Sequence, residues 1–234
     1  MRTIGLIGGM SWESTQHYYR LINEGVRDRL GGLHSAELVL VSVDFAVIER
    51  LQQAGDWDRA GASLADAACR LEAAGADCVL LCTNTMHRVA DAVAGAVGIP
   101  LLHLADATAE RLVAAGIGRV ALLGTRYTME QDFYRARLEA SGLDVRVPDT
   151  DGRAALQSII FDELCRGEVR EQSRERVLAE IDALATGGAE AVIAGCTELT
   201  LLLDPSQVAL PLFDTTAIHA ESAVDFALAT KAVA

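Results

Sequence analysis

Two cysteines of the sequence have surroundings suited to acid and base chemistry. Cys82 and Cys196 each end an apolar segment of the kind that forms a buried strand, and each is followed by a threonine. A thiol has an ordinary pKa of about 8.5, so it can act as an acid when protonated and as a base when ionised. Two thiols on opposite faces of an amino acid could remove the α-proton from one face and return a proton to the other. This chemistry inverts the configuration at the α-carbon without a cofactor.

The other three cysteines have simpler explanations. Cys69 falls on an apolar helix face, Cys78 falls inside a predicted strand, and Cys165 lies late in a predicted helix. Free cysteine is often a small buried hydrophobe, and these positions fit that role. Cys82 and Cys196 differ because each lies just before a predicted helix or turn, where unpaired backbone N–H groups favour a thiolate. We therefore expect a lowered pKa for these two thiols.

The second half of the sequence repeats the first half, a pattern that indicates duplication of a structural unit. Three blocks match in the same order. The middle block leads to Cys82 in one half and to Cys196 in the other, so the two cysteines occupy equivalent positions of the repeat. The matching blocks are 4–8 with 120–124, 75–80 with 188–193, and 99–103 with 210–214.

Short apolar segments alternate with longer stretches of helical period, such as Asp58 to Ala74. This alternation is typical of βα units that build a parallel sheet. We predict an α/β fold of two similar lobes, each a parallel sheet flanked by helices, related by pseudo-two-fold symmetry. The first lobe comprises residues 1–98 with 214–234, and the second comprises residues 99–213. The predicted strands are Thr3 to Ile7, Ala36 to Val43, Asp77 to Leu81, Pro100 to His103, Arg119 to Leu123, Asp144 to Val147, Glu190 to Ala194 and Leu210 to Phe213.

The predicted topology also locates the site. Ligands of open parallel sheets bind at the carboxyl ends of the strands, and both Cys-Thr segments follow strands at that end. No Pro- or Gly-rich linker separates the two halves, which favours lobes that pack face to face. We expect the active site in the cleft between the lobes, with Cys82 and Cys196 facing each other across it.

Composition excludes several classes of partner. The chain has 33 acidic and 20 basic side chains and a net charge of -13, so it lacks the basic surface that nucleic acid or an anionic membrane requires. The apolar run in residues 1–9 is too short for a signal peptide or a spanning helix. Five cysteines without framework spacing fit a reducing compartment. We expect a cytoplasmic protein without nucleic-acid or membrane partners.

Several motifs resemble those of a known family. Segment 82–87, Cys-Thr-Asn-Thr-Met-His, and segment 195–199, Gly-Cys-Thr-Glu-Leu, look like the two signature motifs of the aspartate/glutamate racemase family. Segments 8–15, 123–129 and 213–215 resemble further motifs of that family, so the resemblance covers essentially the whole chain. The sequence is most similar to the bacterial branch of broad-specificity amino-acid racemases.

The resemblance implies an isomerase, an amino-acid racemase that interconverts L- and D-amino acids by a two-cysteine acid/base mechanism. It also implies a homodimer with a small-molecule amino-acid substrate, no pyridoxal phosphate, no other cofactor and no metal. The catalytic pair of the family falls on Cys82 and Cys196. Hydroxyl and amide donors of the neighbouring loops suit an α-carboxylate. The residues expected to bind the substrate are Met10, Gln52, Thr83, Asn84, Thr85, Thr125, Thr128, Thr197 and Glu198.

Other conspicuous residues have structural as well as functional explanations. His87, at a predicted helix start, could cap or pack that helix, and Trp12 could anchor the core. Asp214 and Thr215 have the positions of helix N-caps. Glu198 could tune the neighbouring thiol, contact the substrate ammonium or lie at the surface.

The sequence shows no evident cationic group for a second substrate carboxylate. Members of the family specific for aspartate hold that carboxylate with cationic side chains, whereas segment 42–46 here is Ser-Val-Asp-Phe-Ala. Arg50 and Arg126 are the remaining candidates for the role. We therefore expect several non-aromatic amino acids as substrates, with acidic ones not excluded.

Two alternatives stay open at this point. The same scaffold also serves hydantoin racemases, maleate isomerases and malonate decarboxylases, although decarboxylases of this type keep one cysteine of the pair and both are present here. A small-molecule-binding module without catalysis is the second alternative, and the two intact cysteines argue against it. A dinucleotide-binding enzyme is disfavoured because the glycines of segment 5–9 lack the required spacing.

Overall fold

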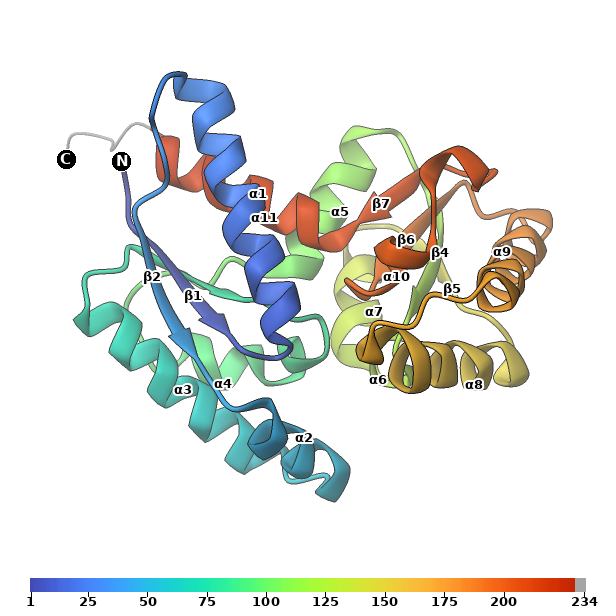
Figure 1. The fold of residues 1–234 in the computed structure, drawn as a ribbon, viewed down its shortest axis with the longest axis horizontal. Coiled ribbons are helices and arrows are strands. Elements are labelled where there is room, and N and C mark those ends of the chain that lie inside the picture. The colour runs from blue at the N-terminus through green and yellow to red at the C-terminus, as the bar shows by residue number, and fades with distance from the viewer. Residues whose placement is uncertain (230–234) are drawn as a thin grey trace. The chain divides into compact units, whose positions relative to one another are not determined.

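The chain forms two compact units, which the computed structural model describes over residues 1–229 (Figure 1). One unit comprises residues 1–103 together with the chain from His219 onward, and the other comprises Leu104–Ile218. The sequence placed these boundaries at 98/99 and 213/214. Residues 230–234, part of the predicted first lobe, lie outside the described residues.

A three-stranded parallel sheet with the strand order β2-β1-β3 forms the centre of the first unit. Its strands are β1 (Ile4–Gly8), β2 (Leu38–Ser42) and β3 (Cys78–Leu81). β1 and β3 are buried along their whole length, as expected for strands covered by helices on both faces. The side chains alternate between two apolar clusters, with Ile7, Val79 and Leu81 in one and Ile4, Leu6, Cys78 and Leu80 in the other.

Helices cover both faces of this sheet (Figure 1). The buried leucines and alanines of α3 pack on the face that includes Ile7, whereas Tyr18 of α1 and Ala220 of α11 pack on the face that includes Leu6. Ser11, Asp44 and Asp56 cap the first three helices with side-chain oxygens that accept backbone N–H groups. The helices are α1 (Trp12–Leu30), α2 (Phe45–Ala54), α3 (Trp57–Ala73), the 3-10 helix η1 (Thr85–Val89), α4 (Ala90–Ala94) and the part of α11 (Thr215–Leu228) from His219 on.

The second unit contains a four-stranded parallel sheet with the strand order β5-β4-β6-β7. Its strands are β4 (Arg119–Gly124), β5 (Asp144–Arg146), β6 (Ala191–Gly195) and β7 (Leu212–Asp214). β6 is fully buried, and β4 is buried after Arg119. The same alternation recurs here, with Ala121, Leu123, Val192 and Ala194 in one cluster and Val120, Leu122, Ala191 and Ile193 in the other.

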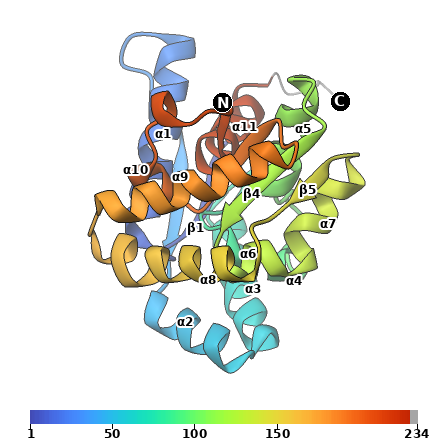
Figure 2. The same ribbon diagram turned by 90° about the vertical axis from the view of Figure 1, so that its right-hand side faces the viewer.

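Two pairs of helices enclose this second sheet. α8 and α9 pack on one face, and Figure 2 shows them side by side in front of β4, while α5 and α7 pack on the other face. The long helices are α5 (Leu104–Ala114), α7 (Asp132–Ala140), α8 (Thr150–Ser158) and α9 (Glu171–Thr186). The short ones are α6 (Arg126–Glu130), α10 (Leu199–Leu202), the π-helical turn η2 (Ile159–Glu163) and the 3-10 helices η3 (Leu164–Arg166) and η4 (Pro205–Gln207).

The α/β fold of two parallel sheets flanked by helices confirms the predicted fold class. One predicted strand is wrong, because Pro100 to His103 forms only an isolated bridge between Leu101 and Val79. Pro100 has no N–H to donate, and α5 begins at Leu104, so the segment is too short for a ladder. Among the described residues, no helix combines the length and the apolar character needed to cross a membrane.

Close packing at the ends of β4 and β6 generates a first prediction. A Cβ at Gly195 would lie 2.9 Å from the Leu123 carbonyl oxygen and 3.2 Å from Thr128 Cγ2. Gly195→Ala should therefore lower the free energy of unfolding by about 1–3 kcal/mol, measured by urea denaturation. Gly118→Ala is the matched control, since its Cβ would meet nothing closer than Glu190 Oε2 at 3.7 Å. Equal stability of the two variants would contradict this account.

Candidate active site

The Cys82 loop of the first unit lies at the carboxyl ends of β1 and β3. Parallel pairing aligns Ile7 with Leu81, and the Cys82 N–H donates to the Ile7 carbonyl at 3.0 Å. The turn after β1 is equally constrained, because Gly9 has φ +91° and its N–H donates to Thr15 Oγ1 at 2.8 Å. A Cβ at Gly9 would lie 2.2 Å from the Val43 carbonyl oxygen, so only glycine fits this turn.

Cys82 itself is fully buried, in the apolar cluster that includes Tyr18 and Leu80. Burial raises the pKa of its thiol far above the ordinary value, because a thiolate would lose its hydration there. The expected lowering of this pKa is therefore wrong. The thiol rests in its neutral, acid form.

The other candidate residues of the first unit lie on the same loops and on α2. Asn84 and Thr85 are buried, and Thr83 is half-buried. Met10 belongs to the apolar cluster that also contains Met86. Gln52 is buried on α2 and donates its side-chain N–H to Met86 Sδ at 2.9 Å. The structure thus brings Gln52, Met10 and the loop that follows Cys82 into one neighbourhood.

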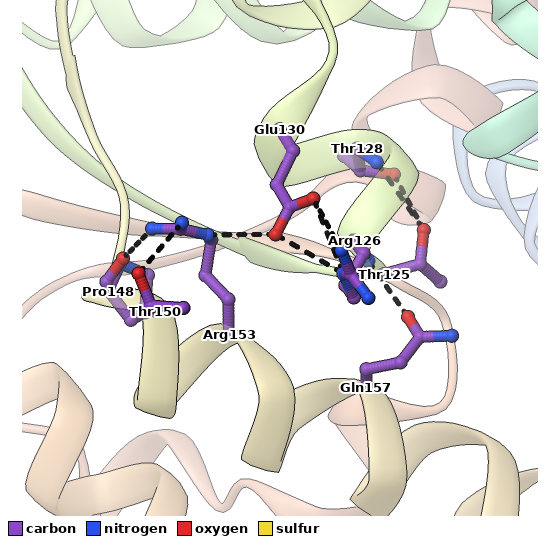
Figure 3. A network of polar contacts seen from close by, with 8 residues as sticks. All are labelled: Thr125, Arg126, Thr128, Glu130, Pro148, Thr150, Arg153 and Gln157. Atoms are coloured by element: carbon purple, nitrogen blue, oxygen red, sulfur yellow. Dashed lines mark hydrogen bonds and ion pairs between the residues drawn. The ribbon is translucent and has the colours of Figure 1, made fainter.

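The corresponding loops of the second unit follow β4 and β6. Parallel pairing aligns Gly124 with Gly195, so Thr125 and Cys196 leave neighbouring strands at the same edge. Thr125 caps α6, and its Oγ1 accepts the Thr128 N–H at 3.4 Å. The two hydroxyl oxygens lie 3.3 Å apart. Figure 3 draws this contact as a dashed line. Both side chains are buried, so the fold holds this pair of hydroxyl groups in place, while their part in binding a substrate stays a prediction.

A polar network attaches this threonine turn to α8 (Figure 3). The Arg126 N–H donates to Gln157 Oε1 at 2.9 Å, and Glu130 binds Arg126 at 3.2 Å and Arg153 at 3.0 Å. The hydrogen bond from Arg126 is the main cause that lowers the pKa of Glu130. Arg126, one of two candidates for a substrate charge clamp, therefore has its guanidinium bound to Glu130.

Cys196 has a carboxylate partner. It is buried, and its thiol donates to Glu198 Oε2 at 2.9 Å. Burial, followed by the negative charge of Glu198, raises the pKa of the Cys196 thiol well above its ordinary value. The expected lowering is thus also wrong for this thiol. Glu198 is oriented to accept the thiol proton, which agrees with one of the roles predicted for it.

Threonines outside the predicted substrate-binding set contact the chain on both sides of Cys196. Thr200 Oγ1 donates to the Thr197 carbonyl at 2.7 Å, and the Thr216 hydroxyl lies 3.2 Å from that of Thr197. Thr215 Oγ1 donates to the Ala194 carbonyl at 2.9 Å. The motif at 213–215 was the sequence signal for Thr215. Thr200 and Thr216 gave none, because the contact of Thr200 depends on the turn after Cys196 and that of Thr216 depends on the packing of two separate segments.

Three buried histidines lie together in the first unit. His87 contacts the rings of His103 and His219, with centroid distances of 4.5 Å and 5.6 Å. His219 interacts through Nδ1 with the Tyr18 hydroxyl at 2.9 Å and through Nε2 with the Leu102 carbonyl at 2.7 Å. The Leu102 oxygen can only accept, so Nε2 carries the proton and Nδ1 accepts from Tyr18. Burial lowers the pKa of His219 to about 4 and that of His87 well below its ordinary value.

Other predictions have different outcomes. Trp12 is 64% exposed, so its interpretation as a core anchor is wrong; as the first residue of α1 it lies on the solvent side of the helix. Asp214 accepts the Thr216 N–H at 2.8 Å, as a capping residue would. That Cys82 and Cys196 face each other stays a prediction, since it concerns the placement of the two units.

These features define a class of protein. Each of two parallel α/β units carries a buried cysteine, followed by a half-buried threonine, at the carboxyl end of a strand and beside hydroxyl and amide donors. Sheets of this kind bind small molecules at that end of their strands. Among residues 1–229, no group of His, Cys, Asp and Glu side chains has the arrangement of a metal site.

The chain belongs to the Asp/Glu/hydantoin racemase family, whose model matches residues 7–223. It is 28% identical over 174 residues to the broad specificity amino-acid racemase RacX of Bacillus subtilis, covering 74% of this chain and 75% of the relative. A protein from Yersinia pestis provisionally described as an Asp/Glu racemase is 53% identical, with a TM-score of 0.93 and coverage of 97% and 100%. An aspartate racemase homologue from Pyrococcus horikoshii is 36% identical, with a TM-score of 0.86 and coverage of 97% and 99%.

The buried histidines generate a prediction about pH. An unfolded chain protonates His219 near pH 6.5, whereas the folded protein resists protonation until about pH 4. Stability is therefore fully present above pH 6.5 and falls as the pH drops toward 4. Between pH 7.5 and 5.0, His219 should account for about 2 kcal/mol of lost unfolding free energy, measured by urea denaturation.

The control for this prediction separates His219 from general acid effects. His219→Asn should show a smaller pH dependence than the wild type, with His87 accounting for part of what remains. His34→Asn, at an exposed position, should keep the wild-type dependence. Identical pH dependence in the wild type and in His219→Asn would rule out this assignment.

Proposed function

We propose that the protein is a cofactor-independent amino-acid racemase in which Cys82 and Cys196 are the paired acid and base. The observation that carries this proposal is the matched placement of the two buried thiols. Each directly follows a strand that pairs with the first strand of its own unit, and each precedes a threonine. Membership of the racemase family supports the same reaction.

The proposed proton transfer begins at Cys196. Its thiol donates a hydrogen bond to Glu198. Transfer of the thiol proton to this carboxylate produces a thiolate, and no base from solvent is needed. The thiolate removes the substrate α-proton and becomes a thiol again. The neutral Cys82 thiol then gives its proton to the opposite face of the planar carbanion and is left as a thiolate. In the reverse direction the two thiols exchange roles.

The surrounding hydroxyl and amide groups stabilise the carbanion. Negative charge from the α-carbon spreads onto the substrate carboxylate during the reaction, and preoriented donors lower the energy of that charge. The hydroxyl pair of Thr125 and Thr128 is buried and held in place by the network around Glu130. We propose that this pair, together with Asn84, Thr85 and Thr197, binds the α-carboxylate.

Single cysteine variants test the two-base mechanism. Cys82→Ser and Cys196→Ser should each lose racemisation, because a hydroxyl has too high a pKa to act as the base. Each should still exchange the α-proton of one enantiomer with deuterium oxide, and the enantiomer should be opposite in the two variants. Proton NMR with a panel of amino acids, on protein dialysed against a chelator and treated with hydroxylamine to remove pyridoxal phosphate, measures both rates.

Three results of that experiment would reject the proposal. Racemisation at near wild-type rate in either variant would make that cysteine structural. Exchange of the same enantiomer by both variants would place both thiols on one face. Activity that appears in the wild type only after addition of metal or pyridoxal phosphate would exclude a cofactor-independent reaction.

The substrate class follows from the charges near the site. Arg126 is bound to Glu130, which neutralises one of the two cations that could hold a side-chain carboxylate. We therefore expect several neutral non-aromatic amino acids to be racemised. A kcat/KM for aspartate more than about a thousandfold above that of every neutral amino acid, worth about 4 kcal/mol, would reveal a charge clamp and contradict this expectation.

A further inference from the structure

The carbonyl group just after each candidate catalytic cysteine accepts a hydrogen bond from a side chain. In the first unit, the Thr83 carbonyl lies 2.8 Å from His87 Nδ1, and a carbonyl can only accept, so Nδ1 is the protonated nitrogen. In the second unit, the Thr197 carbonyl accepts from Thr200 Oγ1 at 2.7 Å. The donors differ chemically, yet both bind the carbonyl of the residue that directly follows a cysteine.

These bonds restrain the backbone on the C-terminal side of each cysteine. On the N-terminal side, the N–H of Cys82 donates to the Ile7 carbonyl and holds the backbone there. Cys196 is held by β6 on its N-terminal side, and on its C-terminal side the Cys196 carbonyl also accepts the Leu199 N–H at 3.1 Å. The backbone of each cysteine is therefore restrained by hydrogen bonds on both sides. These restraints set the direction in which its Cα–Cβ bond points.

His87 is itself tightly held. It is 3% exposed and packs edge-on against His103 and His219, with interplanar angles of 69° and 66°. His219 is fixed in turn by its bonds to Tyr18 and Leu102. Because the ring cannot turn without displacing this cluster, the donor at Nδ1 stays directed at the Thr83 carbonyl. Thr200 is held by α10, and its N–H also donates to the Thr197 carbonyl at 3.3 Å.

We propose that His87 and Thr200 are positioning residues, each of which orients one thiol, Cys82 for His87 and Cys196 for Thr200. This inference rests on the proposed racemase function. Neither residue belongs to the predicted substrate-binding set. Each would affect proton transfer at one face of the substrate only. Loss of one donor therefore disturbs proton transfer at one face and leaves the other intact.

Paired substitutions separate the donor from the volume of the side chain. His87→Asn keeps an N–H near the position of Nδ1 but leaves a void, whereas His87→Leu fills more of the space without a donor. Thr200→Ser keeps the hydroxyl, and Thr200→Val keeps the shape without it. A positioning role predicts that Asn and Ser preserve function. A packing role predicts the reverse order, with Leu and Val better tolerated.

Single-face exchange is the measurement. In a Cys196→Ser background, where Cys82 is the remaining thiol, His87→Leu should slow α-deuterium exchange by about 10- to 100-fold, because small misplacements of a reacting group cost that much. His87→Asn should stay within about threefold of its parent. Thr200→Val should have the large effect only in the Cys82→Ser background. Large effects in both backgrounds, or an order that follows volume, would overturn the proposal.

A second readout does not depend on catalysis. Hydrogen exchange of the backbone over residues 82–86, followed by mass spectrometry, should be faster in His87→Leu than in His87→Asn, and the same order should hold for Thr200→Val and Thr200→Ser over residues 196–199. If the wild type exchanges the α-proton of no amino acid, the proposed racemase function fails. The order of backbone exchange rates in the paired variants still tests the carbonyl contacts in that case. If the order is absent in both pairs, the positioning role fails even when racemisation is observed.

Discussion

Parallel pairing of each cysteine-bearing strand with the first strand of its own unit is the constraint on which the site depends. β3 pairs with β1 and β6 pairs with β4, so the loops after paired strands leave the sheet at the same edge. Close approach there requires residues without side chains, and Gly9 and Gly195 meet that need. The glycines and the register together place a Cys-Thr pair beside the first loop of its own unit.

Burial of these loops has an electrostatic consequence. Thiols removed from water are disfavoured as thiolates, and the pKa of both Cys82 and Cys196 is raised. A neutral thiol is the correct form for the acid of a two-base reaction, but the base needs a means of losing its proton. Glu198 can accept that proton from Cys196, so the two thiols have different surroundings.

Several polar side chains in this fold bind backbone groups of the loops. A buried polar group must find a partner or pay a desolvation penalty, and the partners found here are mostly backbone carbonyls and neighbouring side chains. His219 binds the Leu102 carbonyl, and Thr215 binds the Ala194 carbonyl. The same donors that satisfy buried acceptors therefore make the loops rigid, which suits a site that must hold reacting atoms in a fixed geometry.

The sequence alone determined the α/β class, seven of the eight predicted strands to within two residues and the equivalence of the two Cys-Thr segments. These follow from local patterns, namely apolar alternation, glycine stops and an internal repeat. Tertiary structure decided the rest. The pKa of each thiol is raised because residues distant in the chain bury it. The segment from Pro100 forms an isolated bridge in place of a strand, since α5 begins at Leu104. Arg126 is bound to Glu130, which also binds Arg153. His87, His103 and His219 meet only because packing brings three separate segments together, and no spacing in the sequence encodes that contact.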